Sequence, residues 1–152
     1  MFKISSESDL VECFRPMDRE DLQLPEDLEF PRFVPDYLTW QEVGGHRVYV
    51  VFKAFADRPP LGIVFRRSQG AGAASAMCEW CHSIRAGSSV TLLTARASGK
   101  RVVGIHLCSD LSCREKALAA PGVDDLPQAA HGRERVRRIV QAMSEFALRN
   151  LF

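Results

Sequence analysis

The chain has 152 residues, of which 46% are apolar, 26% charged and 9% aromatic. This composition is that of an ordinary globular protein, and it excludes collagen-like, low-complexity and wholly disordered chains. The net charge of +1 conceals a division, because residues 1–42 carry eleven acidic and four basic side chains, whereas residues 43–152 carry eight acidic and sixteen basic ones.

Residues 1–42 form the acidic part, with a net charge of −7 against +8 for the rest of the chain. We predict a short helix at residues 8–15, followed by a stretch that four prolines keep in extended and turn conformations. Because the two parts carry opposite net charges, we expect this segment to pack on the body of the protein at residues 43–152. The positive charge of the body also favours an anionic binding partner. The expected anchors are aromatic: Phe30, Phe33, Tyr37 and Trp40.

Residues 43–152 are predicted to fold around an antiparallel sheet. A turn at Gly44 and Gly45 opens this part, and a loop of small residues at 68–75 divides it. Runs rich in β-branched and aromatic residues predict four strands, at 47–55, 61–67, 90–97 and 101–108. The short glycine-containing link between the last two is typical of a hairpin.

Two helices are expected after the strands. Ser112 and Glu115 have the spacing of a capping box, which predicts a helix from residue 112 to about residue 120. Residues 133–150 repeat apolar side chains at helical spacing, with arginines at the positions between, which predicts an amphipathic C-terminal helix.

No part of the sequence predicts contact with a membrane. The longest apolar runs, such as residues 48–52, are far shorter than the ~18 residues that a membrane helix needs. The first nine residues lack the basic head and apolar stretch of a signal peptide. We therefore expect a cytoplasmic protein.

Four of the five cysteines form two close pairs, Cys78 with Cys81 and Cys108 with Cys113, separated by 26 residues. Thiols stay reduced in the cytosol, so such a cluster indicates metal or redox chemistry. Zinc prefers four tetrahedral ligands, and here a tight turn, a strand end and the first turn of a helix would supply them. The pattern predicts one structural zinc in a treble-clef finger, within an α+β fold of antiparallel sheet and C-terminal amphipathic helix.

Other uses of these cysteines fit the sequence less well. The string Cys78-Glu79-Trp80-Cys81-His82 matches the attachment motif of haem c, but haem c requires export and leaves the second pair unused. A dithiol redox centre needs one pair only, and a catalytic zinc keeps an open position that four cysteines would close. His82 or His106 could replace a cysteine ligand, although ordinary surface or core roles are the simpler interpretation of both. Cys13 stands alone, as a buried thiol with no special role.

With these motifs, the chain resembles a known family. Residues 77–82, 90–95 and 104–113 are similar to the C-terminal treble-clef zinc-finger domain of the FusB-type proteins, which are fusidic-acid-resistance proteins that bind elongation factor G. The resemblance covers residues 45–150. It implies a zinc site at the two cysteine pairs, docking onto elongation factor G, and release of stalled factor from the ribosome.

The resemblance also implies where a partner binds. In the family an aromatic residue just after the first zinc cysteine, and a lysine and a tyrosine on the following hairpin, engage the factor. Here Glu79 occupies the first position, and the hairpin offers Lys100 and Arg101 but no tyrosine. We predict partner contacts at Glu79 and Trp80, beside the first cysteine, and at Lys100 and Arg101 on the hairpin tip. A second interpretation places Trp80 in the core.

The sequence favours a binding protein over an enzyme. It contains neither a nucleotide-binding glycine loop nor a Ser-His-Asp or paired-carboxylate arrangement. Our first hypothesis is a non-enzymatic zinc finger that acts on a translation factor, with elongation factor G as the expected factor. The alternative is a finger that binds ribosomal RNA through a basic face, which steep salt dependence would reveal. That face would comprise Arg66, Arg67, Arg96, Lys100 and Arg101.

Overall fold

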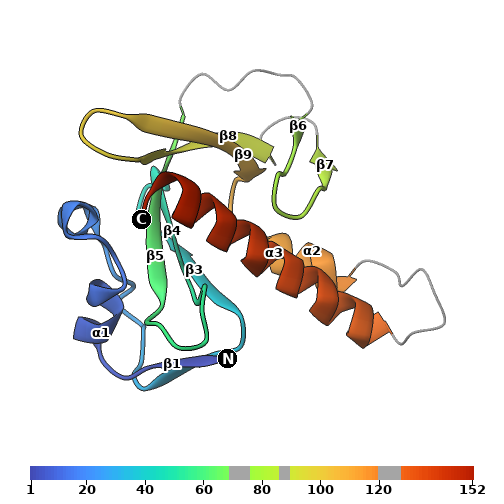
Figure 1. Cartoon of the computed structure of the whole chain (residues 1–152), viewed down its shortest axis with the longest axis horizontal. Coiled ribbons are helices and arrows are strands. Elements are labelled where there is room, and N and C mark those ends of the chain that lie inside the picture. The colour runs from blue at the N-terminus through green and yellow to red at the C-terminus, as the bar shows by residue number, and fades with distance from the viewer. Residues whose placement is uncertain (69–75, 86–89, 120–127) are drawn as a thin grey trace.

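The computed structural model describes residues 1–68, 76–85, 90–119 and 128–152 (Figure 1). Most of the predicted loop at 68–75, and the link between the two predicted helices, lie outside these residues. The elements in chain order are β1 (Phe2–Ile4), α1 (Glu7–Glu12), the 3-10 helix η1 (Pro16–Asp21), β2 (Arg32–Val34), β3 (Tyr37–Gln41), β4 (Arg47–Phe52), β5 (Leu61–Arg67), β6 (Ala76–Met77), β7 (Ile84–Arg85), β8 (Val90–Arg96), β9 (Val102–Cys108), α2 (Cys113–Ala119) and α3 (Gln128–Asn150).

Within the described residues, five strands form one antiparallel sheet in the order β3-β4-β5-β8-β9. The four predicted strands are all present, and the fold class predicted from the sequence is confirmed. The turn between β3 and β4 contains Gly44 and Gly45, whose φ angles of 93° and 72° lie in the left-handed region that suits glycine. Gly99, with φ of 55°, plays the same part in the β8–β9 hairpin.

Strand β4 is buried on both faces of the sheet. Val48, Val50 and Phe52 point into one hydrophobic cluster with the C-terminal helix, and the alternate residues Tyr49 and Val51 point into a second cluster. All five side chains are fully buried. Because neighbouring strand residues face opposite sides, the run Val48–Phe52 can be apolar throughout only if both sides are covered.

Helix α3 covers the first face of the sheet, and helix α2 packs beside it (Figure 1). The α3 side chains in the core recur at helical spacing: Val136, Ile139, Met143, Phe146 and Ala147. The predicted amphipathic helix is therefore present and begins five residues earlier than expected, at Gln128. No helix in the described parts of the chain is both long and apolar enough to span a bilayer.

The segment before β3 covers the second face. Leu10 and Phe14 are completely or almost completely buried against Tyr49, Val51 and Val64. Helix α1 ends at Glu12, so the predicted helix at 8–15 is three residues too long, because the chain turns at Cys13 to enter η1.

The aromatic residues predicted as anchors differ in their roles. Tyr37 is buried, Phe30 and Trp40 are half-buried against the second cluster, and Phe33 is 63% exposed. The prediction for Phe33 was wrong, since β2 turns this side chain outward, where Lys3 of β1 lies over its ring. Tyr37 and Trp40 belong to β3, which joins the main sheet. The division of the chain at residue 42 stays a prediction.

The ion pair between Arg15 and Asp18 belongs to a network that connects η1 to the rest of the protein. The Arg15 guanidinium donates to Asp18 at 2.8 Å and to the carbonyl of Ala97 at 2.8 Å, and it also reaches the carbonyls of Arg96 and Leu151. The side chains of Arg15 and Asp18 are 11% and 4% exposed. One guanidinium thus links the N-terminal segment, the β8–β9 hairpin and the C-terminus.

We expect Arg15→Ala to lower the free energy of unfolding by about 3–5 kcal/mol, because it leaves the Asp18 carboxylate buried without its partner. Urea denaturation followed by circular dichroism measures this change. Glu20→Ala, at an exposed position of the same 3-10 helix, is the control and should change stability by less than about 0.5 kcal/mol. Equal effects of the two variants would show that the Arg15 network contributes little.

Candidate metal centre

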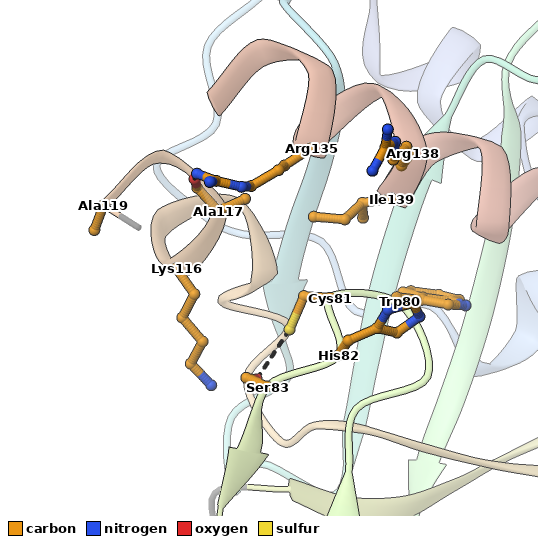
Figure 2. A pocket seen from close by; sticks show the side chains of 10 residues that line it. All are labelled: Trp80, Cys81, His82, Ser83, Lys116, Ala117, Ala119, Arg135, Arg138 and Ile139. Atoms are coloured by element: carbon orange, nitrogen blue, oxygen red, sulfur yellow. Dashed lines mark hydrogen bonds between the residues drawn. The ribbon is translucent and has the colours of Figure 1, made fainter. Parts of the chain in front are cut away.

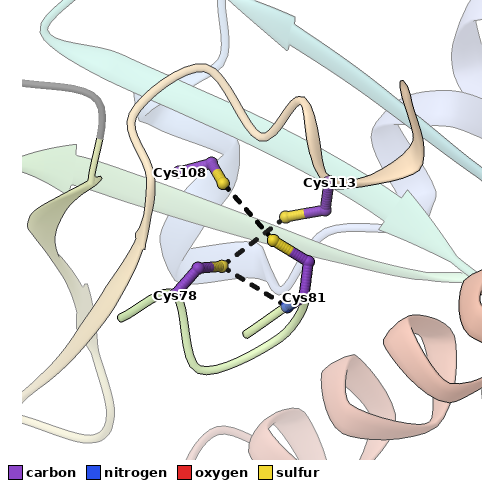
Figure 3. A group of neighbouring side chains, drawn as sticks. All are labelled: Cys78, Cys81, Cys108 and Cys113. Atoms are coloured by element: carbon purple, nitrogen blue, oxygen red, sulfur yellow. Dashed lines mark hydrogen bonds between the residues drawn. The ribbon is translucent and has the colours of Figure 1, made fainter. Parts of the chain in front are cut away.

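The structure brings the four paired cysteines together at one point (Figure 3). Their sulfur atoms all lie within 4.8 Å of one another. The Sγ atoms of Cys78 and Cys113 are 3.7 Å apart, and those of Cys81 and Cys108 are 3.6 Å apart. Three of the four side chains are buried, and Cys81 is half-buried.

The first pair lies in a tight turn between β6 and β7, which we call the knuckle (residues 78–83). The N–H of Cys78 donates to the carbonyl of Ser83 at 2.9 Å, and the N–H of His82 donates to the carbonyl of Cys78 at 2.8 Å. His82 has φ of 62°, which closes the turn. The N–H of Cys81 points at the Cys78 sulfur at 3.5 Å. These bonds aim both sulfurs to the same side.

The second pair is placed by the end of β9 and the start of α2. Cys108 is the last residue of β9, and Cys113 is the first residue of α2, as the sequence predicts. Between them, Leu111 has φ of 54° and donates its N–H to the Cys108 carbonyl at 2.9 Å. Next to Cys113, the backbone N–H of Arg114 donates to the Tyr37 hydroxyl at 2.7 Å, so β3 holds the start of α2.

The four thiols fit a tetrahedral zinc ion. Zinc–sulfur bonds of about 2.3 Å in a tetrahedron put the sulfurs about 3.8 Å apart, close to the two contacts of 3.6 and 3.7 Å. Among the described residues, the potential metal-ligand atoms that lie close together at this point are all cysteine sulfurs. Neither His82 nor His106 belongs to this group. Four cysteine ligands would fill all four coordination positions of the zinc ion. Such a site is structural, because no position is left at which a substrate could bind the metal.

Electrostatics in the cluster also call for a cation. Hydrogen bonds among the sulfurs lower the pKa of Cys108 to about 6 and that of Cys81 further, while they raise the pKa values of Cys78 and Cys113. Four thiolates in contact, three of them buried, would repel one another, so a divalent ion is needed to keep all of them deprotonated.

Two polar side chains that the sequence analysis did not single out touch the sulfurs. The Lys116 ammonium lies 3.0 Å from the Cys108 sulfur, and the Ser83 hydroxyl lies 3.0 Å from the Cys81 sulfur. Lys116 follows Cys113 by three positions on α2 and therefore lies on the same side of that helix. That spacing is the signal that could have identified it.

Trp80, predicted either as a partner contact or as a core residue, is 4% exposed. Its ring centroid lies 5.7 Å from that of Phe65 on β5 and 6.4 Å from that of Phe146 on α3. The indole joins the knuckle to the sheet and to the C-terminal helix, and it offers a partner little surface.

Glu79, Lys100 and Arg101 are all exposed. Glu79 attaches the knuckle to β9, since its N–H donates to the His106 carbonyl at 2.9 Å and its carboxylate accepts from the His106 N–H at 2.8 Å. Lys100 and Arg101 lie at the tip of the β8–β9 hairpin, where the N–H of Arg101 closes the turn on the Ser98 carbonyl.

The arginines of the predicted basic face make contacts inside the protein. Arg66 and Arg96 both bind the Asp21 carboxylate of η1, at 2.8 and 2.9 Å. Arg67 donates to the carbonyls of Gly45 and Ser109. The acidic segment therefore compensates part of the charge on this face.

Cys13 lies apart from the metal cluster, in the second hydrophobic cluster beneath α1. Burial raises the pKa of its thiol to about 11. Its sulfur contacts the Asp9 carbonyl at 3.3 Å.

Comparisons with known proteins agree with this geometry. Residues 7–149 match the model of the family described as "FBP C-terminal treble-clef zinc-finger". Among solved structures, the chain is similar to one titled "Structure of the fusidic acid resistance protein FusC", with a TM-score of 0.51 and 21% sequence identity over 74% of this chain. At this identity the likeness concerns the fold.

The match covers 52% of the FusC chain, so this chain spans about half the length of that structure. No curated protein matches the sequence. The family match and the four-cysteine cluster together establish one structural zinc ion and confirm the predicted cofactor. The chain belongs to the FBP C-terminal treble-clef zinc-finger family, which is the FusB-type family that its cysteine framework resembles.

Proposed function

We propose that this protein is a non-enzymatic binding module of the cytoplasm, that Cys78, Cys81, Cys108 and Cys113 are its zinc ligands, and that it docks onto elongation factor G. Membership of the FusB-type family supports the choice of partner. Release of stalled factor from the ribosome is the action that this docking would serve.

The observation that carries the proposal is the link between the knuckle and the hairpin. Glu79 bonds to both backbone groups of His106, so the metal-fixed turn and strand β9 form one unit. At the end of that unit, Lys100 and Arg101 are exposed. Rigid backbone that presents basic side chains suits recognition of an acidic protein surface, because little conformational freedom is lost on binding.

The nucleic-acid alternative on the predicted basic face has less support. Arg66 and Arg96 share the Asp21 carboxylate, so a phosphate group would have to compete with it. Lys100 and Arg101 remain on that face, and they are the same residues that the translation-factor hypothesis uses.

We expect the zinc-loaded protein to bind elongation factor G in calorimetric titration, and the double variant Lys100→Glu, Arg101→Glu to lose detectable binding. Reversal of both charges replaces attraction to carboxylates by repulsion. Zinc content and the melting temperature should not change, because both side chains are exposed at a turn.

The matched control is Lys3→Glu with Arg32→Glu, which changes the net charge equally at exposed positions of β1 and β2. It should bind as the unmodified protein does. Normal binding by the hairpin variant would contradict the proposed surface. Failure of the unmodified protein to bind the factor, together with tight binding of RNA, would replace the proposal by the nucleic-acid alternative.

A further inference from the structure

A pocket of about 650 Å³ opens beside the metal centre, between the knuckle, α2 and the first half of α3 (Figure 2). Its volume falls in the range of sites that enclose small organic ligands. The proposed docking surface lies elsewhere, at the hairpin tip and Glu79. The pocket therefore has no role in the function proposed above.

The walls of this pocket combine an apolar floor with a basic rim. Trp80, Ala117 and Ile139 form the apolar floor, and each of them is almost completely buried. Around them stand His82 from the knuckle and three cationic side chains from the helices, and Cys81 of the metal centre and Ser83 complete the knuckle side. None of the described residues that line the pocket is Asp or Glu. The three cations are Lys116, Arg135 and Arg138.

The cations are spread around the rim, as Figure 2 shows, rather than gathered at one point. Arg135 donates to the Ala117 carbonyl at 3.3 Å, which holds it near α2. Lys116 is turned toward the Cys108 sulfur at 3.0 Å, and it balances part of the negative charge of the thiolates. Arg138 is 72% exposed, and its contact with Glu134 is long, at 3.5 Å. An isolated anion would fill little of such a space.

We propose that the pocket binds a nucleoside phosphate, either as a free nucleotide or as one unit of an RNA strand. A nucleotide has a planar, weakly polar base and an anionic phosphate, the two properties that the floor and the rim separately match. The imidazole of His82 and the guanidinium of Arg138 are flat groups of the kind on which unpaired bases stack. Lys116 and Arg135 stand on the α2 side of the rim, where they would meet the phosphate.

Two neighbouring arginines on α3 provide a matched pair of variants. Arg137 and Arg138 both contact Glu134, and both are largely exposed, at 66% and 72%. Arg138 lines this pocket, whereas Arg137 lines a separate cavity on the other side of α3. Arg137→Gln and Arg138→Gln change the charge equally, so general electrostatic attraction would respond to both in the same way.

The test is titration of the zinc-loaded full chain with ADP, and separately with an eight-nucleotide oligouridylate, followed by NMR. Backbone amide shifts are expected at residues 80–83, 116–119 and 135–139. Arg138→Gln should weaken the affinity about tenfold, as for loss of a group on which the base stacks, and Arg137→Gln less than twofold. Tighter binding of the oligouridylate with steep salt dependence would identify RNA as the source, and equal or tighter binding of ADP would identify a free nucleotide.

The proposal is overturned if neither probe shifts these amides, if the shifts lie elsewhere, or if the two arginine variants behave alike. The hairpin variant Lys100→Glu, Arg101→Glu should bind ADP normally, because its residues are not in the pocket. The nucleotide pocket and the translation-factor surface can thus fail independently.

Discussion

Replacing Cys113 by alanine is expected to remove the zinc ion and to unfold the protein. Binding of a structural zinc to a four-ligand site is worth about 10 kcal/mol or more, which is as large as the whole stability of a typical domain. Cys113 is completely buried and starts α2, so the hydrophobic cluster that contains Phe65 and Met143 depends on the same site. Cys78→Ala should have the same effect, because that thiol is equally buried.

Elemental analysis of protein purified without added zinc, together with thermal melting, measures both consequences. The unmodified chain should carry about one equivalent of zinc. Cys13→Ala is the control, since this thiol lies in the other hydrophobic cluster, and its zinc content should stay at one equivalent. A Cys113→Ala protein that keeps its zinc and its cooperative melting would contradict the assignment of the ligands.

Deletion of residues 1–42 is expected to leave a chain without a cooperative melting transition. The deletion removes β3 from the sheet and uncovers Tyr49, Val51 and Val64, which the N-terminal segment now buries. Exposing each such side chain costs about 1.5–3 kcal/mol, and the deletion also removes Arg15, whose guanidinium donates to the Ala97 carbonyl. The total approaches the stability of a whole domain.

Differential scanning calorimetry and binding of a hydrophobic dye test this expectation. The control is Glu26→Gln with Asp27→Asn, two exposed positions of the same segment. It reduces the acidic charge without touching the buried side chains, and it should melt like the unmodified protein. An unchanged melting curve of the deletion variant would mean that the segment is dispensable, and a large effect of the control would mean that charge rather than packing holds it.

The strands and helices with strong periodicity could be predicted from the sequence, and so could the metal centre. Leu61–Arg67 forms a strand with the predicted limits, and the strand pattern at 101–108 and the capping box after it placed Cys108 at a strand end and Cys113 at a helix start. Metal ligands are constrained in both type and spacing, so they leave a clear signal in one sequence.

The missed elements are those whose form depends on distant partners. Strands β6 and β7 have two residues each and exist because the knuckle folds between them, so no periodicity could reveal them. Strand β3 follows Pro35, and its residues looked like isolated anchors, since pairing with β4 is decided by the sheet. The apolar run in β4 is typical of a strand that is buried on both faces, but it could not show that the acidic segment forms one of the two covers.

The bond between Glu79 and His106 has a consequence for the solubility of the protein. Strand β9 is an outer strand of the sheet, and the outward N–H and carbonyl of an outer strand are a template on which another chain can pair. The knuckle occupies both of these groups at the middle of β9. Because zinc holds the knuckle in shape, the metal also keeps the middle of this sheet edge paired and closed to another chain.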